Sequence, residues 1–177
     1  MKIVVLVMLV TGFAIAQGPP ALPAACGPDL TGFDVKTEKS QSAPAQPDPG
    51  KALVYFIQDS GPMGNHQHAT IRIGLDGAWV GAYKHNSYFS VSVEPGERHV
   101  CVTAQSYKSG MVGLAHFTAE AGKVYYFRTQ LMAGITTIYP TAPHLDLDQP
   151  DSDQAKYLIG SFPASVWKSK KLSREEF

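Results

Sequence analysis

From Lys51 onward, apolar and polar residues alternate in short runs that are typical of β-strands. In residues 69–75, Ile71, Ile73 and Leu75 share one face of the predicted strand, and polar or small residues share the other. Residues 52–58, ALVYFIQ, are continuously apolar and have the length of a strand. The pattern predicts seven strands, at residues 52–58, 69–75, 78–83, 88–93, 98–105, 114–119 and 124–131.

Turn residues separate these runs. Asp76-Gly77 favours a type I′ hairpin turn, which needs a positive φ at both central residues. Pro95-Gly96 fits a type II turn, and residues 120–123, EAGK, provide another turn. Short strands at this spacing predict an all-β fold, an antiparallel immunoglobulin-like β-sandwich of about seven strands. A small open barrel is the alternative.

The period changes near the C-terminus, where residues 151–162 favour one short helix. Asp151 can cap this helix, and Gln154 follows three residues later, as in a capping box. The apolar residues Ala155, Leu158, Ile159 and Phe162 then recur at helical spacing. We therefore expect the helix to pack on the edge of a β-sandwich domain that spans residues 51–162.

The first sixteen residues resemble a secretory signal peptide. Lys2 gives the positive start, residues 3–15 are almost entirely apolar, and Ala14 and Ala16 suit cleavage before Gln17. The apolar run is shorter than the roughly 20 residues of a membrane-spanning helix. Export to the periplasm, the cell surface or the medium is therefore expected, with no transmembrane segment after cleavage. A lipid anchor on Cys26 is a weaker alternative, because Pro23 is poorly suited to a lipidation motif.

Residues 17–50 hold seven of the thirteen prolines and few apolar side chains, which is typical of a linker. Within them, Phe33 and Val35 alternate with polar residues and can add an edge strand if Cys26 is tethered. Residues 163–177 carry mixed charges and are predicted to be a solvated C-terminal tail.

The chain has 15 basic and 15 acidic residues, so no overall field favours nucleic acid or an anionic membrane. It has two cysteines, Cys26 and Cys101. In an oxidising compartment such a pair most simply forms one disulfide. Two free thiols, or a lipidated Cys26 with a free Cys101, are the alternatives.

The segments GKALVYF, RIGLDGAWVGAY, SYFSVSVEPGERHV and EAGKVYYFR follow one another in the order seen in the bacterial domain of unknown function 2846. Over residues 50–159 the chain resembles this family, and it is distantly similar to PEGA-type surface domains. The resemblance implies an exported, often lipid-anchored β domain of the cell envelope without an established reaction. Trp79 and the cysteine pair depart from the family pattern.

Three aromatic residues suggest a binding surface. If Val80 faces inward, Trp79 and Tyr83 share the outer face of their strand, and Tyr88 lies on the outer face of the next strand. Such a strip suits stacking on a glycan or anchoring an envelope protein. The alternative is that these rings fill gaps between strands, or lie under the N-terminal segment or the C-terminal helix.

Candidate chemistry elsewhere is weak. His66 and His68 are spaced as a pair, but zinc needs three or four converging ligands, so no metal site and no cofactor are expected. The sequence lacks the common motifs of hydrolases, zinc proteases and nucleotide-binding loops. We therefore expect a non-catalytic envelope module with a structural or binding role. The alternative is a metal-dependent or thiol-dependent enzyme that uses His66, His68, His99 or Cys101.

Overall fold

The computed structural model describes residues 22–39, 45–60, 69–105, 111–132 and 144–173. The described residues contain ten strands and one helix. These elements are β1 (Thr31–Glu38), β2 (Ala52–Gln58), β3 (Ile71–Leu75), β4 (Ala78–Tyr83), β5 (Ser87–Val93), β6 (Gly96–Ala104), β7 (Val112–Ala119), β8 (Val124–Met132), β9 (His144–Asp148), α1 (Ser152–Ser161) and β10 (Ala164–Lys171).

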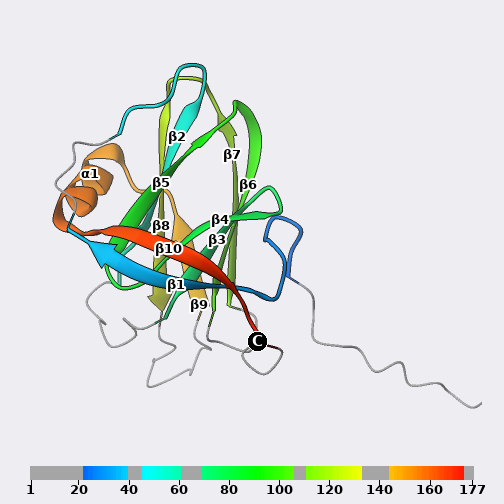
Figure 1. Cartoon of the computed structure of the whole chain (residues 1–177). Helices are drawn as coiled ribbons and strands as arrows, with labels where there is room; N and C mark the ends of the chain where they lie inside the picture. The colour runs from blue at the N-terminus through cyan, green and yellow to red at the C-terminus, as the bar shows by residue number, and fades with distance from the viewer. Residues whose placement is uncertain (1–21, 40–44, 61–68, 106–110, 133–143, 174–177) are drawn as a thin grey trace, which may run out of the picture.

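The strands form two packed sheets (Figure 1). One sheet has six strands in the order β1-β10-β5-β2-β8-β9, and the other has four in the order β4-β3-β6-β7. The predicted all-β sandwich with one short helix is therefore confirmed. The strand number and direction differ from the prediction, because the sheets hold ten strands and β2 pairs in parallel with β8.

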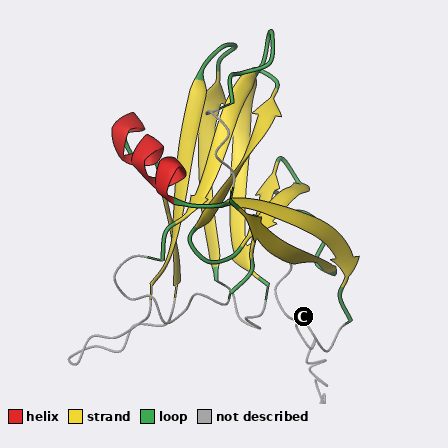
Figure 2. Ribbon diagram, turned by 60° about the vertical axis from the view of Figure 1, so that its left-hand side comes forward, coloured by secondary structure: helices red, strands yellow, loops and turns green. Residues whose placement is uncertain are grey.

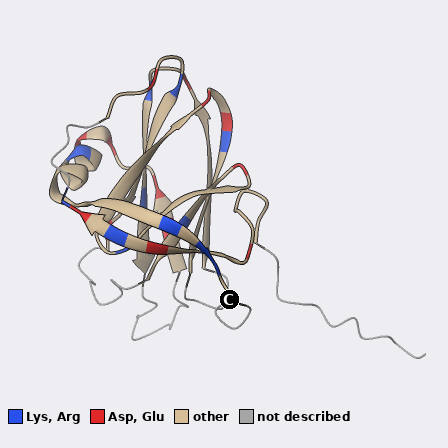
Figure 3. Cartoon of the chain, in the orientation of Figure 1, with Lys and Arg blue, Asp and Glu red and all other residues tan. Residues whose placement is uncertain are grey.

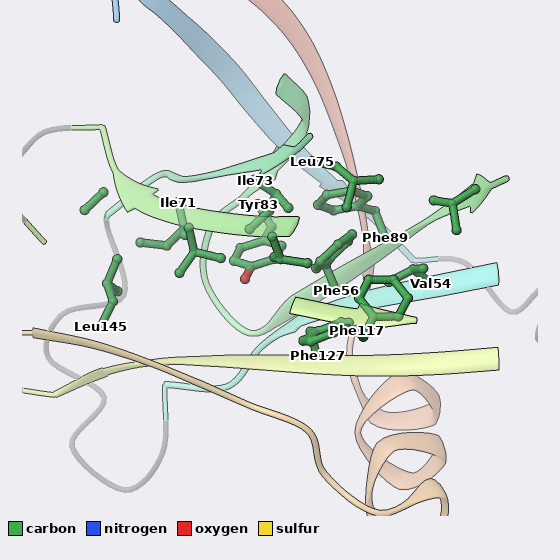
Figure 4. Packing of buried hydrophobic residues seen from close by; sticks show 14 of the residues in the cluster. Val54, Phe56, Ile71, Ile73, Leu75, Tyr83, Phe89, Phe117, Phe127 and Leu145 are labelled. Atoms are coloured by element: carbon green, nitrogen blue, oxygen red, sulfur yellow. The ribbon is translucent and has the colours of Figure 1, made fainter. Parts of the chain in front are cut away.

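The hydrophobic core lies between the two sheets (Figure 4). Phe56 and Phe127 come from the six-stranded sheet, and their rings stack at a centroid distance of 5.8 Å. Ile71 and Ile73 come from the facing sheet, and all four side chains are fully buried. The alternation of β3 thus identifies its core face correctly.

The helix covers the outer face of the six-stranded sheet. Leu158 and Ile159 of α1 form a second cluster with Leu53, Tyr55 and Ile57 of β2. This cover explains why β2 is continuously apolar, since one face contacts the other sheet and the other face contacts the helix. The predicted cap is present, because the side chain of Asp151 accepts hydrogen bonds from the backbone N–H groups of the first turn.

The turn chemistry also agrees with the sequence. Asp76 and Gly77, between β3 and β4, have φ angles of 52° and 88°, as a type I′ turn requires. Gly96 and Gly122 also have positive φ angles, at the two other predicted turns. Glycine is favoured at these positions because it has no Cβ to clash.

One predicted segment is wrong, and one predicted strand is present. Residues 164–171 form β10, although residues 163–177 were expected to be a solvated tail. Residues 31–38 form β1 at the edge of the six-stranded sheet, as the alternation of Phe33 and Val35 predicts for a tethered Cys26. The two strands pair antiparallel over their whole length and form a two-stranded ribbon that crosses one side of the sandwich (Figure 2). Neither strand has enough apolar residues to be buried alone, and for β10 only the pairing with β1 shows that it is a strand.

Candidate binding groove beside the N-terminal strap

The segment of residues 23–30, which we call the strap, lies against the outer face of the four-stranded sheet. Cys26 in the strap forms a disulfide with Cys101 of β6, and the two Cα atoms are 5.1 Å apart. The predicted disulfide is therefore confirmed. Lipidation of Cys26 and a free Cys101 do not fit this structure, because both sulfur atoms are used in the bridge.

The hairpin of β3 and β4 is shaped to receive the strap. The backbone N–H of Gly77 donates a hydrogen bond of 3.1 Å to the carbonyl oxygen of Ala25. A Cβ atom on Gly74 would lie 2.9 Å from this oxygen and from the Cα of Cys26. Glycine at position 74 thus allows a close approach of two backbones that any larger residue would prevent.

Arg72 anchors the chain that leads from the strap into β1. Its Nη1 donates hydrogen bonds to the carbonyl oxygens of Asp29 and Thr31, at 3.2 and 2.8 Å. Its guanidinium lies 4.6 Å from the ring centre of Trp79, a cation–π contact. Desolvation lowers the pKa of Arg72 to about 10, while Asp29 acts in the opposite direction. The side chain is therefore charged at neutral pH and binds these carbonyls as a cation.

The structure does not show the expected exposed strip of Trp79, Tyr83 and Tyr88. Tyr83 is fully buried in the core, and Tyr88 is 9% exposed. Trp79 is partly buried, and its Nε1 donates a hydrogen bond of 2.8 Å to the carbonyl oxygen of Pro28 in the strap. The alternative interpretation, in which these rings fill gaps or lie under other segments, describes the structure better.

Tyr83 turns inward because β4 contains a bulge. Ile73 pairs with Gly81, whereas Gly74 pairs with Trp79, so Val80 is an extra residue between them. The bulge shifts the alternation of β4, so Tyr83 shares the core face with Ile71 and Ile73. The alternation of β4 does not indicate the bulge; the sequence signal for it is Gly81, since glycine inside a strand often marks a bulge.

Tyr88 and Trp79 do lie on the predicted outer faces, but other segments cover both. Tyr88 belongs to the cluster under α1, with Leu158 and Ile159. Trp79 belongs to a small cluster with Phe33, Val35, Ala82 and Trp167, between the hairpin and the β1–β10 ribbon. A strand pattern alone does not show which outer face a distant segment will cover.

Burial changes the acid–base behaviour of Tyr83. Desolvation raises its pKa, although a hydrogen bond of its hydroxyl to Thr129 acts in the opposite direction. An unfolded tyrosine ionises near pH 10, where the folded state still holds its proton. The folded state then binds more protons, so stability must fall as the pH rises above about 10.

We expect a Tyr83→Phe variant to show a shallower loss of stability at alkaline pH than the unmodified chain. The difference in slope should approach about 1.4 kcal/mol per pH unit, the value for one proton. Urea unfolding between pH 8 and 11 measures this slope. Parallel pH profiles for the two proteins would show that Tyr83 ionises equally in both states.

A surface groove opens where the ribbon meets the hairpin. It has a volume of about 490 Å³ and is lined by Thr31, Phe33, Trp79, Trp167, Lys168 and Ser169. Trp167 contacts the core below, with its ring centre 4.6 Å from that of Phe89. The groove combines aromatic rings with hydroxyl groups and an ammonium group, which is a composition suited to ligand binding.

Of the three predicted binding residues, only Trp79 lines this groove. Sequence reasoning missed Trp167, Phe33 and Ser169 because they lie in segments interpreted as a tail and a linker. The only available signal was the short alternation around Phe33 and Val35, and the isolated tryptophan among lysines in SVWKSKK.

Of the candidate catalytic and metal-binding residues, His99 and Cys101 lie in the described part of the chain, and they do not form a catalytic pair there. Cys101 is bonded to Cys26, so the thiol-dependent hypothesis loses its nucleophile. His99 is on the exposed face of β6, and His66 and His68 lie outside the described residues. In the described part of the chain, no group of three or more His, Cys, Asp or Glu side chains is placed to hold a metal ion.

Within the described residues, no helix is both long enough and apolar enough to cross a bilayer.

Residues 48–141 match the family model described as "Protein of unknown function (DUF2846)". The matched region contains β2 to β8, the turns between them and Cys101, but it excludes the strap, the helix and both strands of the ribbon. No curated protein and no solved structure matches the chain. The strap and the ribbon therefore lie outside the matched region. The groove is lined by residues outside this region and by Trp79 inside it.

Proposed function

We propose that this chain, which belongs to the DUF2846 family of proteins of unknown function, is an exported, non-catalytic module that binds a glycan of the cell envelope in the groove. The observation that carries the proposal is the groove of about 490 Å³ with two tryptophans in its lining. Pockets of this size accommodate small ligands.

Export is supported by two independent features. The first sixteen residues have the pattern of a secretory signal. The Cys26–Cys101 disulfide is consistent with an oxidising compartment, because such bonds persist outside the reducing cytosol. Together they favour the periplasm, the cell surface or the medium as the place of action.

A binding role is favoured over catalysis by the way the polar side chains are used. Arg72 is buried against carbonyl oxygens of the N-terminal segment, and Cys101 is in the disulfide. Both residues thus stabilise the strap. The polar residues that line the groove are Lys168, Ser169 and Thr31. They do not form the hydrogen-bonded pair that general acid–base catalysis requires.

A glycan fits the chemistry of the groove better than a large protein partner does. The aromatic rings of the groove can contact the apolar C–H groups of a sugar, while hydroxyl and ammonium groups can bond to sugar hydroxyls. The ribbon carries residues of both charges close together (Figure 3), and Lys170 forms an ion pair with Asp34 at 2.8 Å. The mixed charges give this surface no strong preference for a charged protein.

The test is a variant that fills the groove without changing the core. Ser169→Trp places a large ring in the groove, and Val166→Trp places the same ring on the exposed outer face of β10 as the matched control. Binding to soluble peptidoglycan fragments and to N-acetylglucosamine oligomers is measured by calorimetry. We expect the unmodified chain and the control to bind, and Ser169→Trp to lose binding with unchanged melting.

Two outcomes would contradict the proposal. One is that the unmodified chain binds neither class of oligosaccharide, and the other is that Ser169→Trp binds as tightly as the control does. Either result would leave the groove without a role in glycan recognition.

A further inference from the structure

Two histidines stand directly opposite each other on the outer face of the four-stranded sheet. His99 of β6 pairs with His116 of β7, and their ring centres are 6.3 Å apart. Both side chains are exposed, and that of His99 is 55% accessible. The pair is remote in sequence, so no local motif indicates it.

The backbone places this pair at the closest spacing that antiparallel strands offer. The N–H of His99 donates to the Oδ1 of Asp76 at 2.8 Å, and the carbonyl oxygen of His99 accepts from the N–H of Asp76 at 3.0 Å. Both backbone groups of His99 thus point away from β7. His99 and His116 therefore form a non-hydrogen-bonded pair, in which the Cα atoms are about 4.5 Å apart and the side chains lie closest.

We propose that His99 and His116 form a surface site for a divalent transition-metal ion, with Cu²⁺ bound more tightly than Ni²⁺ or Zn²⁺. A metal held about 2 Å from one nitrogen of each ring, at a square-planar or tetrahedral angle, places the ring centres roughly 4.5 to 5 Å apart. Rotations of the two exposed side chains can close the present distance of 6.3 Å. Imidazole is a preferred ligand of these metals, and copper heads their order of affinity.

The surroundings favour a cation and leave room for its other ligands. The Oε1 of Glu97 lies 3.7 Å from the Nε2 of His99, so a negative charge stands beside the pair. A depression of about 170 Å³ adjoins the rings. It is lined by both histidines and by Ala25, Val100, Leu114 and Ala115. Water can occupy the remaining coordination positions of the metal there.

The disulfide fixes the part of β6 that carries His99 against the strap. Cys101 follows His99 by two residues on the same face of β6, and it is bonded to the strap residue Cys26. Ala25 of the strap forms one wall of the depression. The histidines are therefore mounted on a rigid strand pair, which reduces the entropy lost when a metal binds both rings.

The test titrates the full, oxidised, untagged chain with CuCl₂, NiCl₂ and ZnCl₂ at neutral pH by calorimetry. We expect one Cu²⁺ per chain at this site. Its electron paramagnetic resonance spectrum should show two imidazole nitrogens bound to the metal. His99→Ala and His116→Ala should each weaken Cu²⁺ binding at least about tenfold, since losing a group that only supports a ligand already costs that much.

Two control variants identify the site. His144→Ala removes an exposed histidine on β9, and His66→Ala with His68→Ala removes the pair that is adjacent in sequence. Both controls should retain the tight Cu²⁺ site, and Cu²⁺ should raise their melting temperature as it does for the unmodified chain. Unchanged affinity in His99→Ala and His116→Ala, or a loss confined to the His66/His68 variant, would overturn the proposal.

Discussion

Removing the Cys26–Cys101 disulfide should lower the free energy of unfolding by about 4 kcal/mol. The bridge joins residues 75 apart in sequence, and closing so long a loop greatly restricts the unfolded chain. A Cys26→Ala/Cys101→Ala variant should therefore unfold at a much lower urea concentration than the oxidised chain. Urea denaturation of both proteins, followed by tryptophan fluorescence, measures this difference.

The control for this prediction separates the bridge from the other contacts of the strap. Trp79→Phe keeps the disulfide but removes the hydrogen bond from Nε1 to the carbonyl oxygen of Pro28. Its cost should be about 1 kcal/mol, the usual net contribution of one hydrogen bond. If the double cysteine variant loses no more than Trp79→Phe does, non-covalent contacts and not the disulfide hold the strap in place.

Trp167→Ala should destabilise the protein by about 3 kcal/mol, although sequence reasoning placed this residue in a solvated tail. The indole contacts the ring of Phe89, and it fills the space over Gly81, where a Cβ atom would lie 2.8 Å from it. Truncating a large aromatic residue leaves such a space empty, and this is the main cost in aromatic-to-alanine variants. The partial exposure of Trp167 places the value at the lower end of their range.

Val166→Ala is the matched control on the same strand. Val166 points to the outer face of the ribbon and is 38% exposed, so its truncation should change the stability by less than about 0.5 kcal/mol. Thermal or urea unfolding of the two variants decides the point. Equal stability of Trp167→Ala and Val166→Ala would mean that β10 is not an integral strand of the domain.

The two stability predictions concern contacts that close the same side of the sandwich. The strap covers the outer face of the β3–β4 hairpin, and the ribbon covers the side between β4 and β5. The proposed groove lies where these two covers meet, and Trp79 contacts both. A groove built from three segments far apart in sequence can be held rigid only if each segment is anchored, which is the role we assign to the disulfide, Arg72 and Trp167.

The sequence by itself determined the features that depend on near neighbours. Alternation identified β3 and the core face of β5, because the side-chain direction in a strand is fixed by its period of two. Asp76-Gly77 identified a hairpin, because few residues adopt a positive φ at low cost. Asp151 identified the start of α1 through its side-chain bonds to the first turn.

The tertiary structure decided everything that depends on which segment covers which face. A single bulge turned Tyr83 into the core, α1 covered Tyr88, and the strap covered Trp79. The ribbon of β1 and β10 exists because two weakly apolar segments pair across most of the chain. Burial and long-range pairing are properties of the whole fold, so no short window of sequence contains the information that places the groove.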